Sequence, residues 1–154
     1  MTVVARIEVD VSKLTKALAP KERLEAPLKK FLTKAALTVE GRAKEKSPVD
    51  TGRLRSSITH KIGKERALVG SNVFYAPYVE FGTRPHFPPV GALATWARRH
   101  GFASPWPLAV AISRRGTRPH PYLGPALEDS RGDVDRFLKE MGEEVVKLGE
   151  GADS

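Results

Sequence analysis

The sequence predicts an α+β fold in which a long amphipathic helix packs on a small, mostly antiparallel sheet, followed by a helical C-terminal half. Three observations support this prediction. Apolar and polar residues alternate at the start of the chain, apolar residues recur three and four apart over residues 21–46, and short apolar runs separated by Gly and Pro fill the second half. A length of 154 residues suffices for one domain with a modest core.

The first residues are expected to form a strand of the sheet. Apolar and polar side chains alternate over Val3–Val9, which is typical of a strand with one buried face. Asp10 or Ser12 can then cap a short helix that runs to Leu18, and Pro20 interrupts it.

Lys21–Lys46 is predicted to be one long helix, with Pro27 as an alternative first residue. Its apolar side chains fall on a single face. They are Leu24, Leu28, Phe31, Leu32, Ala35, Val39 and Ala43. The opposite face carries four basic side chains that are expected to be solvated, namely Lys29, Lys30, Lys34 and Arg42.

A tight connection and a hairpin are expected after the long helix. The segment PVDTG, residues 48–52, contains side chains that hydrogen-bond nearby backbone in turns. A strand is predicted over Leu54–Ile62, a turn at Gly63–Lys64 and a second strand over Arg66–Ser71.

Helices are expected in the rest of the chain. Three short ones are predicted over Tyr75–Phe81, Val90–Arg99 and Trp106–Arg115, and a longer one from about Pro125, in which Gly132 can introduce a bend. Trp96, Phe102 and Trp106 are expected to pack in the core; the alternative, a stacking platform for bases, would need them exposed beside the arginines. The predicted organisation is a single domain over residues 1–148 and a disordered tail over residues 149–154.

The pentapeptide GTRPH occurs twice, at Gly82–His86 and Gly116–His120, and each copy follows a predicted helix. Glycine after a helix and proline soon afterwards are typical helix-stop signals. The 34-residue offset matches some helical repeats, but there is no third copy to build a solenoid. Helix termination accounts for the Gly and Pro. It does not account for the recurring Arg and His, which leaves a contact role open.

Net charge is +8 and is unevenly distributed. Residues 47–120 carry 11 basic and 3 acidic side chains, whereas residues 121–154 carry 4 basic and 9 acidic ones. This asymmetry suggests either nucleic-acid contact or head-to-tail self-association between the two regions. The chain has no cysteine, no glutamine and one asparagine, which excludes disulfides and suggests a thermophilic source. No apolar run approaches the length of a membrane span, and no secretion signal is expected.

The residues do not form a recognisable catalytic constellation. Ser56, Ser57 and Asp50 lack the context of a nucleophile elbow, and no Gly-rich phosphate loop follows a strand. His86 and His120 could bind a metal only if the two arms met, and no further ligand pattern supports this. We therefore expect no enzyme activity, no metal and no cofactor.

Several segments occur in an order that resembles a phage protein family. They are SPVDTGRLRSSI (47–58), VGSNVFYAPYVEFGT (69–83), LATWARRHG (93–101) and RPHPYLGPALED (118–129). This succession is similar to the neck and tail-component, or tail-completion, proteins of long-tailed phages (siphoviruses), with the lambda minor tail protein Z as a distant relative. The resemblance covers about Val3 to Val146.

The resemblance implies a structural virion protein of the head–tail junction, acting as an oligomeric ring in virion assembly after synthesis in the bacterial host cytoplasm. Implied partners are further copies of the chain and other neck, connector or tail proteins, with no membrane. The expected interface residues are Asp50, Thr51, Gly52, Arg53, Tyr75, Tyr78, Glu80, Phe81, Arg84, His86, Arg118 and His120. Non-specific contact with packaged DNA is expected from Arg98, Arg99, Arg114 and Arg115.

The alternative function is a basic nucleic-acid-binding protein, suggested by the charge of residues 47–120. The two functions differ in their response to salt. Affinity for nucleic acid falls steeply as salt rises, whereas a ring held by apolar surfaces persists.

Overall fold

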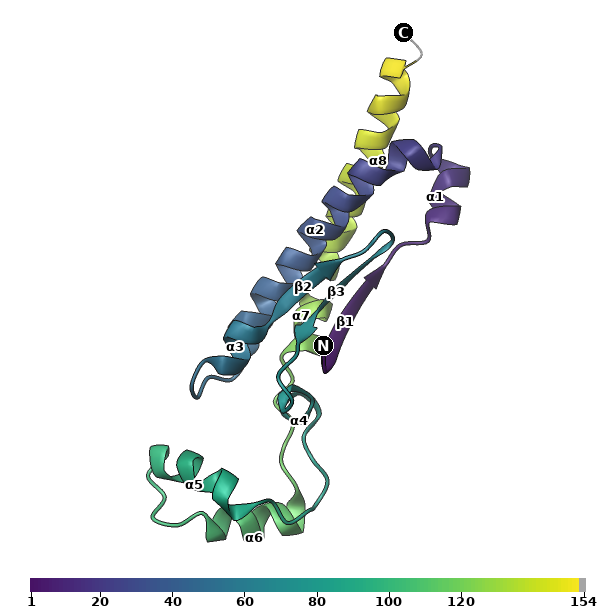
Figure 1. The fold of residues 1–154 in the computed structure, drawn as a ribbon. Helices are drawn as coiled ribbons and strands as arrows, with labels where there is room; N and C mark the ends of the chain where they lie inside the picture. Colours follow the sequence, from purple (N-terminus) through teal and green to yellow (C-terminus); the bar gives the residue numbers. More distant parts are fainter. Residues whose placement is uncertain (153–154) are drawn as a thin grey trace. The chain divides into compact units, whose positions relative to one another are not determined.

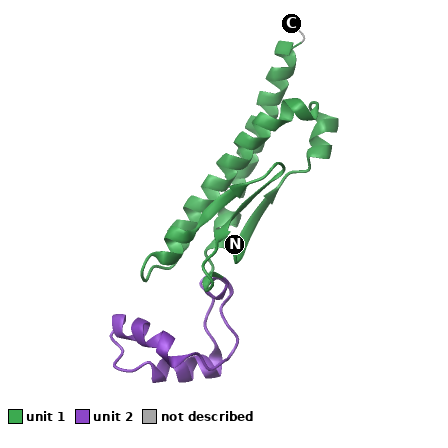
Figure 2. Cartoon of the chain, in the orientation of Figure 1, with its two compact units in different colours: residues 1–76, 121–154 green, residues 77–120 purple. Residues whose placement is uncertain are grey.

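The computed structural model describes residues 1–152, whose three strands and eight helices are drawn in Figure 1. Internal contacts divide the chain into two compact units, coloured separately in Figure 2. Unit 1 comprises Met1–Ala76 and the chain from Pro121 onward, and unit 2 comprises Pro77–His120. The single domain predicted for residues 1–148 stays a prediction.

The sheet of unit 1 has three antiparallel strands in the order β1-β3-β2. Strand β1 (Val3–Glu8) pairs with the central strand β3 (Arg66–Ser71), which pairs on its other side with β2 (Thr59–Ile62). Alternate residues of β1 are buried, as the sequence predicts. The predicted turn at Gly63–Lys64 is also confirmed, since the Gly63 amide donates to the Arg66 carbonyl at 2.8 Å.

The strand predicted over Leu54–Ile62 is wrong in its first half. Arg53–Ser57 forms a short helix, α3, and β2 begins only at Thr59. Leu54 and Ile58 are both buried, and a spacing of four places them on the same side of a helical turn. The Ser57 hydroxyl donates to the Leu54 carbonyl at 2.6 Å, which favours the turn over an extended backbone.

The long helix is confirmed with the predicted bounds. After α1 (Val11–Ala17), helix α2 spans Lys21–Lys46 and holds Pro27 inside it. Its apolar face lies against β2 and β3, and Phe31 and Leu32 are 3% and 0% exposed. This face supplies more buried side chains to the core of unit 1 than any other element.

Two helices from the end of the chain pack beside α2 (Figure 1). They are α7 (Leu123–Asp129) and α8 (Arg131–Ala152), and the break between them lies at Ser130 instead of Gly132. Ser130 is fully buried and its hydroxyl donates to the Ala126 carbonyl at 2.6 Å, a bond that bends helices. Residues 149–152, predicted to be disordered, continue α8, and residues 153–154 of that prediction lie outside the described residues.

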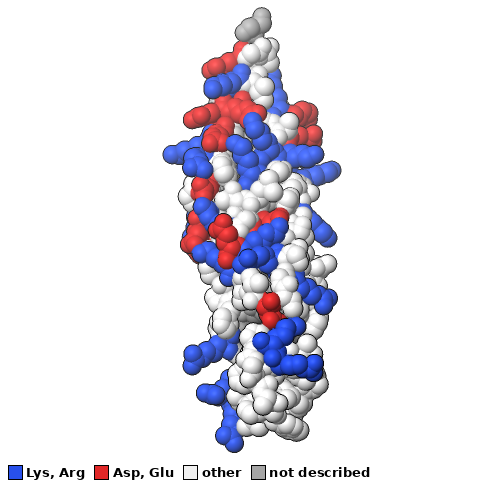
Figure 3. Space-filling view, turned by 90° about the vertical axis from the view of Figure 1, so that its left-hand side faces the viewer, with Lys and Arg blue, Asp and Glu red and all other residues white. Residues whose placement is uncertain are grey.

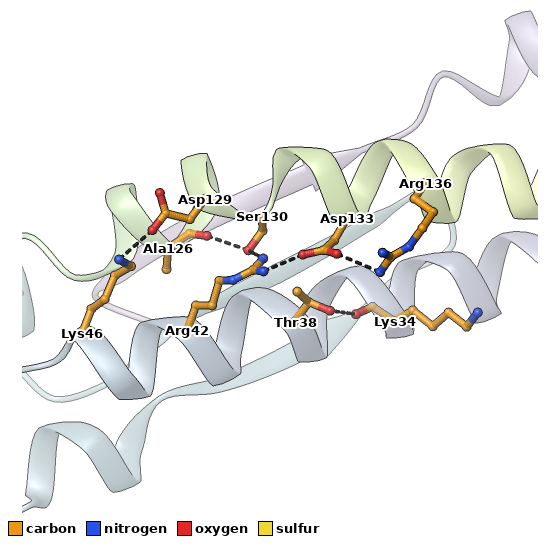
Figure 4. A network of polar contacts seen from close by, with 9 residues as sticks. All are labelled: Lys34, Thr38, Arg42, Lys46, Ala126, Asp129, Ser130, Asp133 and Arg136. Atoms are coloured by element: carbon orange, nitrogen blue, oxygen red, sulfur yellow. Dashed lines mark hydrogen bonds and ion pairs between the residues drawn. The ribbon is translucent and has the colours of Figure 1, made fainter.

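Three of the basic side chains on α2 are not simply solvated, which corrects the expectation for that face. Lys30 bonds Glu144 at 2.9 Å and Lys34 bonds Glu140 at 2.8 Å, both on α8. Nearer the break, Arg42 donates to Asp133 at 2.6 Å and to the Ser130 hydroxyl at 2.9 Å (Figure 4). The acidic end of the chain is therefore paired with the basic face of α2 in the same molecule.

Unit 2 contains most of α4 (Ala76–Phe81) together with α5 (Val90–Arg99) and α6 (Trp106–Arg115). These three helices have nearly the predicted bounds. The aliphatic side chains buried here are small apart from Ile112, since the others are Ala97 and Ala109. Within residues 1–152, no helix combines the length and apolar character that a membrane crossing requires.

Candidate functional site

The two GTRPH copies pair with each other in unit 2. Thr83 and Thr117 form an antiparallel bridge in which each backbone N–H donates to the other carbonyl, at 3.2 and 3.3 Å. Their hydroxyl oxygens lie 3.0 Å apart and share a hydrogen bond. Equivalent residues of the repeat thus contact each other, so that the duplicated sequence forms a nearly two-fold symmetric pair. We call residues 82–86 and 116–120 the paired arms.

Glycine begins both arms because the pairing requires it. Gly82 and Gly116 have φ values of +71° and +69°, in the left-handed region. A Cβ atom at Gly82 would collide with the Thr117 carbonyl, and one at Gly116 with the Thr83 carbonyl. The repeated glycines therefore end the preceding helices and also admit the partner backbone.

The arm histidines adopt matching local conformations but do not meet. His86 Nδ1 donates to the Arg84 carbonyl at 2.9 Å, and His120 Nδ1 to the Arg118 carbonyl at 3.2 Å. The backbone N–H of His86 bonds Ile112, whereas that of His120 bonds Val79. The antiparallel pairing thus places the two rings at opposite ends of the arms. No group of three or more potential metal-ligating side chains is present among residues 1–152.

The paired arms lead into α5 and α6, where large aromatic rings are exposed. The expected core positions of Phe102 and Trp106 are wrong, since these residues are 49% and 57% exposed, and Trp96 is only half-buried. Trp96 stacks on His100 with centroids 4.0 Å apart and lies near Phe102. A unit spanning only residues 77–120 has too little volume to enclose these rings.

One side of α6 carries a continuous row of exposed side chains. Trp106, Val110 and Arg114 are spaced by four residues and are all exposed, while Ala109 and Ile112 on the other side are buried. Phe87, 57% exposed, lies against Trp106 with ring centroids 6.0 Å apart. We call these four exposed residues, Phe87, Trp106, Val110 and Arg114, the α6 stripe.

The cations of unit 2 are all arginines, and all six are exposed. They are Arg84, Arg98, Arg99, Arg114, Arg115 and Arg118. The only acidic residue in Pro77–His120 is Glu80, which is 5% exposed. Apart from Arg99, these arginines make no ion pair with any residue in the described range 1–152. On the face drawn in Figure 3, the part around α5 and α6 shows blue and white atoms.

The expected interface residues fall into two groups. The four from the PVDTG turn and its flank lie in unit 1. Asp50, Thr51 and Gly52 connect α2 to α3, and Arg53 is the first residue of α3. All others except Tyr75 lie in unit 2, where Tyr78 and Phe81 are 56% and 72% exposed. The burial of Glu80 removes it from the surface. The four expected DNA-contacting arginines lie at the C-terminal ends of α5 and α6.

Sequence reasoning missed Phe87, Trp106 and Val110 as surface residues. A signal was present in the composition, because eight of the eleven aromatic residues fall within residues 74–106 and few aliphatic residues accompany them. A core needs aliphatic partners for its rings, and their scarcity indicates exposure.

Comparison with known proteins gives one family match, which covers the first part of the chain. Residues 11–82, just under half of the sequence, match a family described as "Bacteriophage HK97-gp10, putative tail-component". No curated protein and no solved structure matches the chain significantly. The matched residues extend from the start of α1 to Gly82, which begins the first arm. The segments 93–101 and 118–129, on which the resemblance also rests, lie outside the match. By its description, the family consists of phage tail components. Residues 11–82 thus carry the sequence pattern of the HK97-gp10 phage tail-component family, which confirms the resemblance over these residues and is consistent with a siphovirus neck or tail-completion protein.

Proposed function

We propose that this chain is a structural component of the head–tail junction of a long-tailed phage or prophage, where several copies form a ring that completes the tail or joins it to the head. The observation that carries the proposal is the match of residues 11–82 to a phage tail-component family. The exposed arms and the α6 stripe support it, because an assembly protein needs surface for neighbouring subunits and rings.

The charge pairing within unit 1 limits how such a ring can form. The sequence alone suggested that the acidic residues after 120 meet the basic middle of a neighbouring copy. In the structure, Asp129, Asp133, Glu140 and Glu144 pair with α2 of the same chain. These four carboxylates are therefore less available to a neighbouring copy. The PVDTG turn (residues 48–52), which is exposed apart from the half-buried Gly52, is the contact surface between copies that we favour.

Deletion of the gene in the phage that encodes this chain tests the proposal. Electron microscopy of the lysate should show DNA-filled heads and separate tails, and expression of the full chain in trans should restore joined, infectious particles. Native mass spectrometry of the full-length protein, alone and on isolated tails, should give a fixed number of copies above one. Normal infectious particles without the protein would refute the proposal.

A second candidate function is non-specific DNA binding. The exposed arginines of unit 2 favour it, because all of them except Arg99 make no ion pair within residues 1–152. Binding to duplex DNA should then weaken steeply between low and moderate salt, with a slope set by the number of phosphates contacted. Replacement of Arg98, Arg99, Arg114 and Arg115 by Ala should reduce that slope. An unchanged slope would exclude these residues from DNA contact.

A further inference from the structure

The composition of unit 2 is that of a protein-binding surface. Protein interfaces are enriched in aromatic residues and Arg and depleted of Lys, Glu and Asp. All 12 lysines of the chain lie outside Pro77–His120, as do all aspartates, and the unit has one buried Glu. Its exposed side chains include six Arg together with Tyr78, Phe81, Phe87, Phe102 and Trp106.

The α6 stripe concentrates this composition on one side of a helix. Trp106 is large, exposed and held against Phe87, so it can enter a partner without losing much side-chain freedom. Val110 extends the apolar surface by one turn, and Arg114 ends it with a cation that has no acidic partner in residues 1–152. Aromatic residues and Arg are the side chains that dominate binding energy at protein interfaces.

Net charge argues against a second copy as the partner of this stripe. Unit 2 carries six arginines against one buried glutamate, and unit 1 carries 20 basic against 17 acidic residues, so both units are positive. Asp129, Asp133, Glu140 and Glu144 of unit 1 already bind α2. A neighbouring copy therefore repels unit 2 by its net charge, and a partner with unpaired carboxylates fits the stripe better.

Duplex DNA also fits the stripe poorly. Phosphate binding uses Lys and Arg alike. Phe87, Trp106 and Val110 would not contribute to binding, because a duplex has no unstacked bases for them to contact. The absence of lysine and the presence of these apolar side chains point instead to a protein.

We infer that the α6 stripe docks in an apolar groove of a different virion protein, with carboxylates of that protein at the groove end that receives Arg114. That the partner is a virion protein rests on the proposed function. The inference adds that unit 2 is the part of the chain that docks. The paired arms hold the start and the end of this α5–α6 segment together through Thr83 and Thr117, so that the stripe is presented on a closed support.

The test uses tails and DNA-filled heads isolated from a phage lacking the gene, together with the purified full-length chain. Cosedimentation should show that the chain binds one of the two particles. Trp106→Ala and Arg114→Glu should each weaken that binding at least about tenfold, as expected for interface anchors. Leu37→Ala, at an exposed apolar residue of α2, and Lys64→Glu, in the β2–β3 turn, are the matched controls and should bind like the natural chain.

The outcomes separate the two proposals. If the natural chain binds heads or tails and both stripe variants bind equally well, the stripe is not the docking surface, while the proposed function stands. If the natural chain binds neither particle, both proposals fail. If the variants lose affinity for a duplex DNA probe but keep their affinity for particles, the surface binds DNA and the inference is overturned. Unchanged circular dichroism of each variant shows that the fold is retained.

Discussion

Thr83 and Thr117 lie 34 residues apart in the sequence and bond each other through both backbone groups and both hydroxyls. The pair explains why one pentapeptide occurs twice in this chain. The antiparallel bridge satisfies Thr83 and Thr117 with the same pair of backbone bonds, although the His86 and His120 amides bond different residues. The duplicated Arg and His follow the bridge on each arm and are exposed at its two ends.

Substitution of the arm glycines should destabilise unit 2. Both sites require a positive φ, which costs about 1–2 kcal/mol for alanine because of its Cβ. In Gly82→Ala and Gly116→Ala the new Cβ also meets the opposite Thr carbonyl. Hydrogen exchange should show faster exchange of the Thr83 and Thr117 amides. Gly91→Ala, on α5 with open space around its Cα, is the control and should be neutral or slightly stabilising. Unchanged protection of both amides would contradict the role of the bridge.

Truncation of the central aromatic residue of α2 should destabilise unit 1. Phe31 is 3% exposed, and Phe31→Ala should lower the free energy of unfolding by about 3–5 kcal/mol through lost burial and a cavity. Leu37→Ala, on the same helix but 52% exposed, should stay within about 0.5 kcal/mol. Urea unfolding measures both. Equal midpoints for Phe31→Ala and the natural chain would remove Phe31 from the core.

Acid should weaken the pairing of α2 with α7 and α8. Hydrogen bonds from Lys46, Arg42 and Lys34 hold the pKa values of Asp129, Asp133 and Glu140 below their ordinary values of 3.8, 3.8 and 4.5. A carboxyl whose pKa is lower in the folded state contributes its full stabilisation above the ordinary value. That contribution is lost as the pH falls below it, towards the folded pKa.

The melting temperature should therefore begin to fall as the pH drops below about 4.5, the ordinary pKa value of Glu140. High salt should reduce the effect, chiefly through the Lys34–Glu140 pair, whose side chains are 44% and 47% exposed to solvent. The double variant Asp133→Asn with Glu140→Gln should be less stable at neutral pH and should depend less on pH. If the melting temperature of this variant falls with pH below 4.5 as steeply as that of the natural chain, other carboxyls govern acid unfolding.

Loss of both arm arginines should affect assembly without affecting the fold. Arg84 and Arg118 are exposed and bond no acidic residue within the described part of the chain. The double variant Arg84→Ala with Arg118→Ala should change the free energy of unfolding by no more than about 0.5 kcal/mol. It should still reduce the yield of joined, infectious particles in the complementation assay. Full infectivity would limit the repeat to its backbone role.

Much of unit 1 could be predicted because local pattern and burial agree there. The three-four spacing over Lys21–Lys46 gave the helix its bounds, and alternation identified β1. The strand prediction for Leu54–Ser57 was wrong because a short run with apolar residues four apart fits either a strand or one helical turn. The position of the helix break was predicted wrongly for another reason. The break at Ser130 depends on a hydrogen bond from the Ser130 hydroxyl and on a residue distant in sequence, Arg42.

The sequence identified the residues of the paired arms but not how the arms are arranged. The repeat drew attention to Arg84, His86, Arg118 and His120, yet nothing in one sequence indicates that two identical segments bind each other. The exposure of Trp106 was missed because large apolar rings are usually buried. Here the shortage of aliphatic residues in Pro77–His120 outweighs that tendency.

The bridge between Thr83 and Thr117 closes the chain at the base of the α5–α6 segment, so that this segment leaves and returns at the same place. The match to the phage family stops at the same point, at Gly82. We therefore expect residues 87–115 to tolerate replacement by another sequence whose ends meet at the bridge, because Gly82, Gly116 and the two threonines stay in place. Under the proposed function, a change of docking partner would then require a change in this one short segment, with the helix and sheet of unit 1 kept.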